Sequence, residues 1–161
     1  MPVDLTSLLL DLSGLDDAQA EQLGRAEFKS LYIPQGTRGA LTAYDGSQIV
    51  FFEDQFDHAF FTTSDRYRHE FAKNVLARDR VARVRWIGPI LRGEVPNTQC
   101  WESLRSPGTG QIKRLCIASA ELYVIWLDAR SDGGWRFSTA YVARAAQASG
   151  YMYGKKVVWK V

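Results

Sequence analysis

The sequence predicts an α+β fold in a single domain, with N-terminal helices packed on a mainly antiparallel β-sheet. Helical periodicity dominates the first part of the 161-residue chain, and strand-forming runs separated by Gly/Pro turns dominate the second. The hydrophobic content of 46% is that of a folded protein with a real core. We expect a helical extension over residues 1–35 and an α+β body over residues 36–161.

The first elements are two helices and a hairpin. Apolar residues recur at helical spacing over residues 3–12 and 16–30, and aspartates that favour a helix start precede the second of these runs. A Pro/Gly turn follows. Residues 40–44 and 48–53 then read as two strands, and the Asp45-Gly46 pair between them predicts a type I′ hairpin turn.

Two further helices are expected in the middle of the chain. Ser64-Asp65 can cap a helix that runs to about Arg78, and a second helix covers about residues 79–91, with Pro89 tightening or kinking its last turn. The apolar face of the first helix carries Tyr67, Phe71 and Val75, and that of the second carries Val81, Val84, Ile87 and Leu91.

The second half of the chain is rich in strand signals. The expected strands cover residues 99–104, 112–119, 122–127, 135–142 and 156–161, and a short helix covers residues 143–148. This order, helices first and then an antiparallel meander, is typical of α+β proteins.

Positive charge is concentrated in the middle of the chain. From Phe60 to Arg92, eight Lys/Arg face three Asp/Glu, a net charge of +5, whereas residues 1–29 carry a net charge of −4. The basic residues alternate with aromatic ones, which favours a phosphate-rich partner such as a nucleic acid. The alternative is an ordinary solvated helix face, but such a face would alternate its charges, and Arg80, Arg83 and Arg85 have only Asp79 nearby in the sequence.

The spacing of the cysteines and the length of the apolar runs indicate the cellular location of the protein. Cys100 and Cys116 lie in expected strands without a Cys-x-x-Cys pair, and the chain has only two histidines, so a zinc site is not expected. Buried reduced thiols are favoured over a cross-strand disulfide. The N-terminal apolar run is too short for a signal peptide, and no run approaches a membrane span. We expect a cytoplasmic protein with no membrane association.

One histidine precedes the basic region and the other lies within it. His58 follows Asp57, whose carboxylate can orient the imidazole, and His69 shares a helical face with Arg66 and Lys73. Histidine is the side chain best suited to proton transfer near neutral pH. A structural or surface role is the competing interpretation for each histidine.

Thr139 is a further candidate, in the expected strand over residues 135–142. Regular alternation would put Phe137 and Thr139 on one side of the sheet, with Ser138 and Ala140 on the other. Threonine is also a common strand former, which is the plainer explanation.

Known catalytic motifs are absent from the sequence. It has no Walker loop, no GxGxxG after a strand, no GxSxG elbow and no HExxH. We therefore expect no cofactor and no metal, and a mechanism based on cations and histidine.

Four segments together resemble the phage-associated nucleases of the barnase–EndoU–colicin–RelE superfamily. The resemblance covers about residues 50–143. The segments are Asp57–Phe60, Arg83–Leu91, Leu122–Leu127 and Phe137–Tyr141. The resemblance implies helices packed on an antiparallel sheet whose face binds RNA, so that residues 36–161 would be a nuclease-like domain.

The resemblance also implies metal-independent RNA cleavage by attack of the ribose 2′-OH. His58 would act as base or acid, Arg85 or Arg83 as phosphate clamp, and Thr139 as a hydrogen-bond donor to the phosphate or the transition state. The second proton-transfer group is left open between His69, Lys113 and Tyr141. The substrate-binding residues would be Arg66, Lys73, Arg80, Arg83 and Tyr141.

Three functions follow from these observations. The first is a small ribonuclease of the toxin or phage-borne effector kind, for which a cognate inhibitor protein is an expected partner. The second is a non-catalytic module that binds nucleic acid or a phosphoprotein. In the third, the acidic N-terminal segment covers the chain's own basic face or a neighbour's, which suits autoinhibition or a homodimer. RNA is expected over DNA only through the resemblance.

Overall fold

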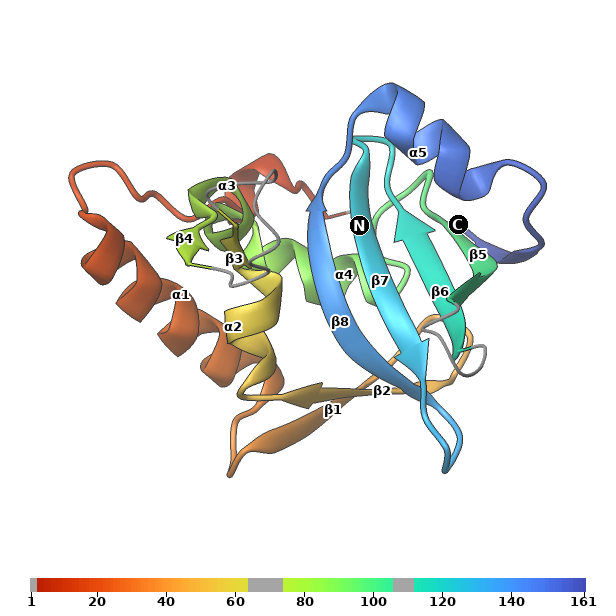
Figure 1. The fold of residues 1–161 in the computed structure, drawn as a ribbon, viewed down its shortest axis with the longest axis horizontal. Helices are drawn as coiled ribbons and strands as arrows, with labels where there is room; N and C mark the ends of the chain where they lie inside the picture. Colours follow the sequence, from red (N-terminus) through yellow and green to blue (C-terminus); the bar gives the residue numbers. More distant parts are fainter. Residues whose placement is uncertain (1–2, 64–73, 106–111) are drawn as a thin grey trace.

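The centre of the computed structural model is a seven-stranded sheet with the order β1-β2-β8-β7-β6-β5-β9 (Figure 1). The structure describes residues 3–63, 74–105 and 112–161. Neighbouring strands are antiparallel except for β2 and β8. The strands of this sheet are β1 (Arg38–Thr42), β2 (Gln48–Phe52), β5 (Gln99–Arg105), β6 (Ile112–Ala118), β7 (Tyr123–Ala129), β8 (Trp135–Val142) and β9 (Val157–Lys160). The predicted α+β class is confirmed.

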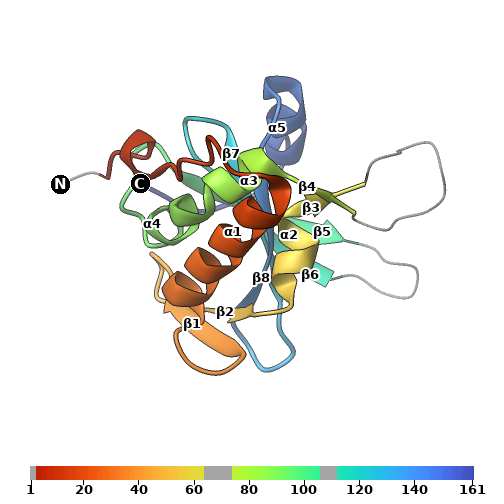
Figure 2. The same cartoon turned by 90° about the vertical axis from the view of Figure 1, so that its left-hand side faces the viewer.

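Helices cover the two faces of the sheet unequally. In Figure 1, α1, α2 and α3 lie to one side of β8 and α4 passes behind it, whereas α5 crosses above the upper ends of β6 and β7; Figure 2 views the first four helices from their own side. The helices are α1 (Asp17–Tyr32), α2 (Gln55–Ala59), α3 (Arg78–Ala82), α4 (Ile87–Leu91) and α5 (Ala145–Met152), with 3-10 turns η1 (Thr6–Leu8) and η2 (Val84–Trp86). A small separate hairpin pairs β3 (Phe61–Thr62) with β4 (Val75–Leu76).

Helix α1 corresponds to the predicted helix over residues 16–30. It begins with a capping box, in which the Asp16 carboxylate accepts from the Gln19 backbone N–H at 2.8 Å and the Gln19 side chain accepts from the Asp16 backbone N–H at 3.0 Å. Its buried face includes Phe28, whose ring lies 5.6–6.1 Å from five other aromatic rings of the core. A Cβ on Gly24 would lie 2.7 Å from a Val81 methyl, so glycine permits the close approach of α3.

The segment before α1 is not the helix predicted over residues 3–12. Only Thr6–Leu8 forms a 3-10 turn, and the backbone is extended after it. The Leu10 N–H donates to the Ala82 carbonyl at 2.9 Å, and most of the segment's leucines are buried in the main core. Docking on α3 therefore supplies the burial and hydrogen bonding that a helix would have supplied, and overrides the weak local propensity.

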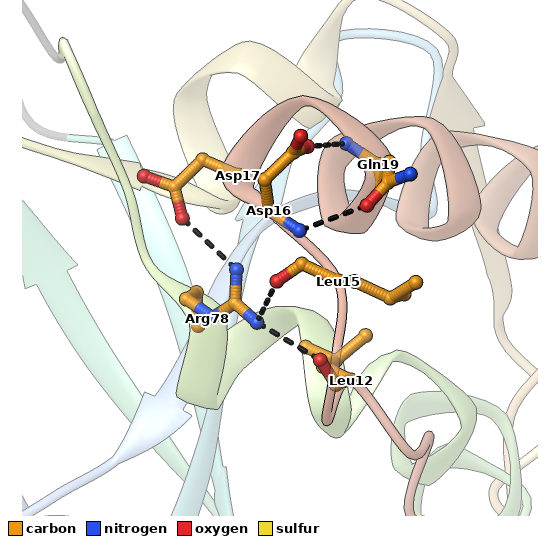
Figure 3. A network of polar contacts seen from close by, with 6 residues as sticks. All are labelled: Leu12, Leu15, Asp16, Asp17, Gln19 and Arg78. Carbon is orange, nitrogen blue, oxygen red and sulfur yellow. Dashed lines mark hydrogen bonds and ion pairs between the residues drawn. The ribbon is translucent and has the colours of Figure 1, made fainter.

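Arg78 holds this N-terminal segment in place (Figure 3). Its Nη1 donates to the Asp17 carboxylate at 3.0 Å, and its Nη2 donates to the carbonyl oxygens of Leu12 and Leu15 at 3.0 and 2.9 Å. One guanidinium thus joins the start of α3 to the start of α1 and to the turn before it.

Residues 74–91 differ from the two predicted helices. Residues 64–73 lie outside the described residues, and the end of the first predicted helix is strand β4. The second predicted helix is instead α3, η2 and α4 in succession, broken at Arg83. Pro89 causes no kink because it is the third residue of α4, where a backbone N–H has no acceptor within the helix. The predicted buried set Val81, Val84, Ile87 and Leu91 is fully buried.

The β-hairpin and the strands of the second half are confirmed within two residues at each end. The hairpin turn, however, is not of type I′. Residues 43–47 connect the strands, and Gly46 alone among them has a positive φ, of 88°, whereas a type I′ turn needs positive φ at both central residues.

A β-bulge at Ser138 changes the side of the sheet to which the following side chains of β8 point. Thr139 lies opposite Trp126, but the next residue of β7 lies opposite Phe137, so Ser138 is the extra residue. Phe137 and Ala140 both join the core beneath α1–α4, and Thr139 shares the other face with Trp126. The predicted alternation, with Phe137 and Thr139 on one side, is therefore wrong.

The two cysteines are free and buried on opposite faces. Cys100 lies opposite Ile117 and Cys116 lies opposite Trp101, so neighbouring strand positions point their thiols to different sides of the sheet. A disulfide between these strands is excluded by this register, and the prediction of reduced thiols is confirmed for them.

Candidate functional site

The side of β6, β7 and β8 that faces away from α1–α4 carries the candidate site, and we call it the open face. Trp126 lies at its centre. Its indole Nε1 donates to the Tyr141 hydroxyl at 3.1 Å, and that hydroxyl lies 2.7 Å from the Tyr151 hydroxyl of α5. The Trp126 and Tyr151 rings meet edge to face at 4.9 Å. These contacts attach α5 to the sheet and place two phenol hydroxyls side by side.

Two arginines stack on this aromatic group. The Arg80 guanidinium carbon lies 5.0 Å from the centroid of the Tyr141 ring, and its Nη1 donates to the Ala59 carbonyl at 3.2 Å. The Arg114 guanidinium carbon lies 4.5 Å from the Trp126 ring, and its Nε donates to Asp128 at 2.8 Å. Stacking holds both guanidinium groups against aromatic rings of the open face.

An open pocket of about 540 Å³ lies where α3, the end of β8 and the start of α5 meet. We call it the Arg80 pocket. It is lined by Asp79, Arg80, Tyr141, Val142, Arg144 and Gln147. Two arginines and one aspartate give the lining a net positive charge, and Tyr141 and Gln147 add neutral polar groups. Such a lining suits an anion rather than an apolar ligand.

Thr139 lies beside the same aromatic group. The bulge turns its side chain to the open face opposite Trp126. Its Oγ1 is buried and has no hydrogen-bond partner within the described part of the chain. A buried hydroxyl of this kind usually has a partner, so Thr139 is an unexplained polar group next to the pocket.

Helix α2 runs along the edge of β8 that β2 leaves free. The strands β2 and β8 pair only at Trp135 and Arg136 of β8, and beyond them the Gln55 side chain donates to the Ser138 carbonyl at 2.6 Å. His58 lies one helical turn after Gln55 and is exposed. Because Gln55 donates to β8 and the Ala59 carbonyl accepts from Arg80, the helix that carries His58 lies against both the edge of β8 and Arg80.

The expected partner of His58 has another contact. The Asp57 carboxylate forms an ion pair with Arg25 of α1, on the other side of α2 from β8. His58 itself lies in α2, a helix that is absent from the elements predicted from the sequence. A five-residue helix such as Gln55–Ala59 is too short to show clear periodicity, so the sequence does not predict α2.

The other predicted cations lie apart from this site. Arg85 forms a two-pronged ion pair with Glu27 of α1, at 2.9 and 3.1 Å. Arg83 stacks on Trp86 at 5.1 Å and donates to the Asp79 carbonyl at 2.9 Å. The expectation of arginines without acidic partners is wrong for Arg85, because its partner Glu27 comes from the distant helix α1 and not from neighbouring sequence.

The acidic N-terminal segment thus covers part of the chain's own basic region. Asp17 pairs with Arg78 and Glu27 pairs with Arg85. The Arg85 guanidinium lowers the pKa of the Glu27 carboxyl below its ordinary value. The charge asymmetry of the sequence therefore serves, in part, to join α1 to the segment that follows β4.

Three predicted site residues, Arg66, His69 and Lys73, lie outside the described residues. Lys113 pairs with Glu102 at 3.3 Å on the opposite side of the sheet from Arg114, away from the open face. Sequence reasoning missed Arg114, Trp126, Arg144 and Tyr151. Trp126 and Tyr141 stand in facing strands, but only the register with its bulge shows that they meet.

No three His, Cys, Asp or Glu side chains gather to hold a metal ion within residues 3–63, 74–105 and 112–161. Across these same ranges no helix has the length and apolar character needed to cross a membrane. Comparisons of the chain with models of protein families, with curated proteins and with solved structures find no match.

Proposed function

We propose that the chain is a metal-independent endoribonuclease whose active site lies at the edge of β8, between α2, α3 and α5. The observation that carries this proposal is the Arg80 pocket, where two arginines and Tyr141 line a space two residues beyond Thr139 in β8, and where Arg80 bonds the helix that carries His58. The resemblance of residues 50–143 to phage-associated nucleases names the same strand end and the same histidine.

In the proposed reaction the scissile phosphate binds in the Arg80 pocket. A base removes the proton of the ribose 2′-OH, whose oxygen forms a bond to phosphorus, and the bond to the 5′-oxygen breaks as an acid protonates it. The products are a 2′,3′-cyclic phosphate and a 5′-hydroxyl. His58 is the proposed base or acid, since imidazole exchanges protons near neutral pH.

The Tyr141 hydroxyl is suited to hold the phosphate. Its oxygen already accepts from Trp126, and Tyr151 is the second hydroxyl in contact with it. Burial, with a smaller effect of the Tyr141 hydrogen bond, raises the pKa of Tyr151, so that this hydroxyl keeps its proton. With Tyr151 as donor, the Tyr141 proton is directed to a phosphate oxygen.

Arg80 and Arg144 supply the positive charge that the pentacoordinate phosphorus state requires. Fixed donors that meet developing charge commonly contribute about 10²–10³ each in rate. Arg80 is preoriented by its stacking on Tyr141 and its bond to Ala59. We therefore assign the phosphate clamp to Arg80, and the role of Arg85 as clamp stays a prediction from the sequence alone.

The test is cleavage of end-labelled RNA with and without EDTA. We expect cleavage that EDTA does not change, products ending in a cyclic phosphate, and a loss of about 10²–10⁴ in rate for His58→Ala. Arg92→Gln is the matched control, because Arg92 pairs with Glu94 just after α4 and is not among the residues that line the Arg80 pocket. Inhibition by EDTA, or full activity of His58→Ala, would refute the proposal.

A non-catalytic nucleic-acid-binding module is the second candidate, favoured by the two arginines stacked on aromatic rings of the open face. It predicts salt-dependent RNA binding without turnover, unchanged by His58→Ala. In both cases RNA is the proposed partner. A cognate inhibitor, a homodimer and a cytoplasmic location stay predictions.

A further inference from the structure

A second group of arginines lies at the opposite end of the open face, where the sequence showed no concentration of charge. Arg38 of β1 and Arg130, which follows β7, place their guanidinium carbons 5.7 and 5.8 Å from the centroid of the Phe52 ring. Arg136 of β8 and Arg114 of β6 lie on either side of Asp128, at 4.0 and 2.8 Å. Four separate segments of the chain thus bring cations to one place.

The cluster has excess positive charge. Its four arginines face two carboxylates, Asp128 and Asp132, and Arg130 and Asp132 form a two-pronged pair at 2.9 Å. Within the described residues, Arg38 forms no ion pair with a carboxylate, and Arg136 keeps half of its side chain exposed. An open pocket of about 320 Å³ lies over this group, lined in part by Phe52, Arg130 and Arg136.

The two arginine pockets lie on the same side of the sheet. Tyr141 pairs with Val124 and Arg136 pairs with Asp128, so four residues of β7 separate the Arg80 pocket from the second cluster. At about 3.3 Å per residue, this separation is roughly 13 Å. A stacked strand rises about 3.4 Å per nucleotide, so the separation corresponds to about four nucleotides.

The surface between the pockets suits bases. The Arg114 guanidinium carbon lies 4.5 Å from the centroid of the buried Trp126 ring, and the Arg114 side chain is 19% exposed. Planar guanidinium groups are surfaces on which unpaired bases stack. Phosphates at both ends and stacking groups between them are the features of a single-stranded nucleic-acid track.

We propose that Arg38, Arg130 and Arg136 bind a backbone phosphate of the same RNA strand whose scissile phosphate occupies the Arg80 pocket. This inference rests on the proposed function. The substrate is then a single strand of at least about four nucleotides that runs along β7 and β8, and a dinucleotide occupies only the Arg80 pocket.

The test measures equilibrium binding of a dinucleotide and a hexanucleotide of 2′-O-methyl RNA, which cannot be cleaved by 2′-OH attack. In Arg38→Gln/Arg136→Gln we expect about tenfold weaker binding of the hexanucleotide and a salt slope lower by about 0.7, the value for one lost phosphate contact on a single strand. Dinucleotide binding should not change. The Arg38→Lys/Arg136→Lys variant should keep the salt slope, and Arg92→Gln is the control for net charge.

The double variant leaves the Arg114–Asp128 and Arg130–Asp132 pairs in place, and its fold is checked by thermal unfolding. Wild-type affinity of the glutamine variant for the hexanucleotide, or an equal loss for both lengths, would overturn the proposal. If the variant shows the expected length dependence but the wild-type chain does not cleave RNA, the second phosphate site is supported and the ribonuclease proposal is refuted. If the wild-type chain cleaves RNA but the glutamine variant binds the hexanucleotide like the wild type, the ribonuclease proposal is supported and the second phosphate site is refuted.

Discussion

Arg78 should stabilise the fold far more than an ordinary surface arginine, although it carries no catalytic role. Its guanidinium donates to the carbonyls of Leu12 and Leu15 and to Asp17, at 2.9–3.0 Å. The ion pair with the exposed Asp17 contributes at most about 0.5 kcal/mol. Each carbonyl bond contributes about 1 kcal/mol, because truncation leaves the acceptor without its donor. We therefore expect Arg78→Met to lower the free energy of unfolding by about 2 kcal/mol.

Urea denaturation followed by tryptophan fluorescence measures this loss. With a slope of about 2 kcal/mol per molar urea, the midpoint should fall by about 1 M, and the thermal midpoint should fall by about 4–8 °C. Arg92→Met is the control, since Arg92 pairs with the nearby exposed carboxylate of Glu94, and it should cost less than about 0.5 kcal/mol. Equal midpoints for the two variants would refute the role assigned to the network of Figure 3.

Three further predictions concern the core and its supports. A double-mutant cycle of Glu27→Gln and Arg85→Met should give a coupling free energy of about 1 kcal/mol. Because Arg85 lowers the pKa of Glu27 below its ordinary 4.5, this coupling should be complete above pH 4.5 and disappear as the pH falls through the lowered pKa. A coupling free energy that does not depend on pH would contradict this. Burial raises the pKa of the Cys116 thiol to about 12, and the Cys100 thiol is buried as well. Neither thiol should therefore react with a disulfide reagent at pH 8 until the chain is unfolded. Rapid labelling of the folded chain would contradict the burial. Gly39→Ala should prevent stable folding, because its Cβ would lie 1.8 Å from a carbonyl oxygen of α1. The Cβ of Gly150→Ala in α5 meets no atom, so this variant should raise the free energy of unfolding by about 0.5–1 kcal/mol. Equal thermal midpoints for the two variants would refute the contrast.

Local patterns predicted most of the sheet. The strands over residues 99–142 have alternating or continuous apolar character and clear turn residues between them, and such signals depend only on neighbours in sequence. The failures occurred where distant contacts decide the conformation. Leu10 is extended because it bonds Ala82, and the helix over residues 79–91 breaks at Arg83 where the chain turns to pack against α1.

The candidate site was predictable only in part. Arg80, Thr139 and Tyr141 were singled out from charge, residue type and resemblance, and the structure brings them to one face. Two properties of the site depend on tertiary structure alone. The bulge at Ser138 sets the side of the sheet to which Thr139 points. The ion pair of Arg85 with Glu27 of α1 removes Arg85 from the exposed basic surface.

The most direct test of the central claim compares the rates of RNA cleavage by Arg80→Gln and Arg85→Met in the presence of EDTA, after circular dichroism shows both variants folded. We expect the wild-type chain to cleave RNA, Arg80→Gln to lose about 10²–10³ in rate, and Arg85→Met to stay within a few-fold of wild type, because its guanidinium binds Glu27 and not the pocket. No cleavage by the wild-type chain, or a greater loss in Arg85→Met than in Arg80→Gln, would contradict an active site at the Arg80 pocket.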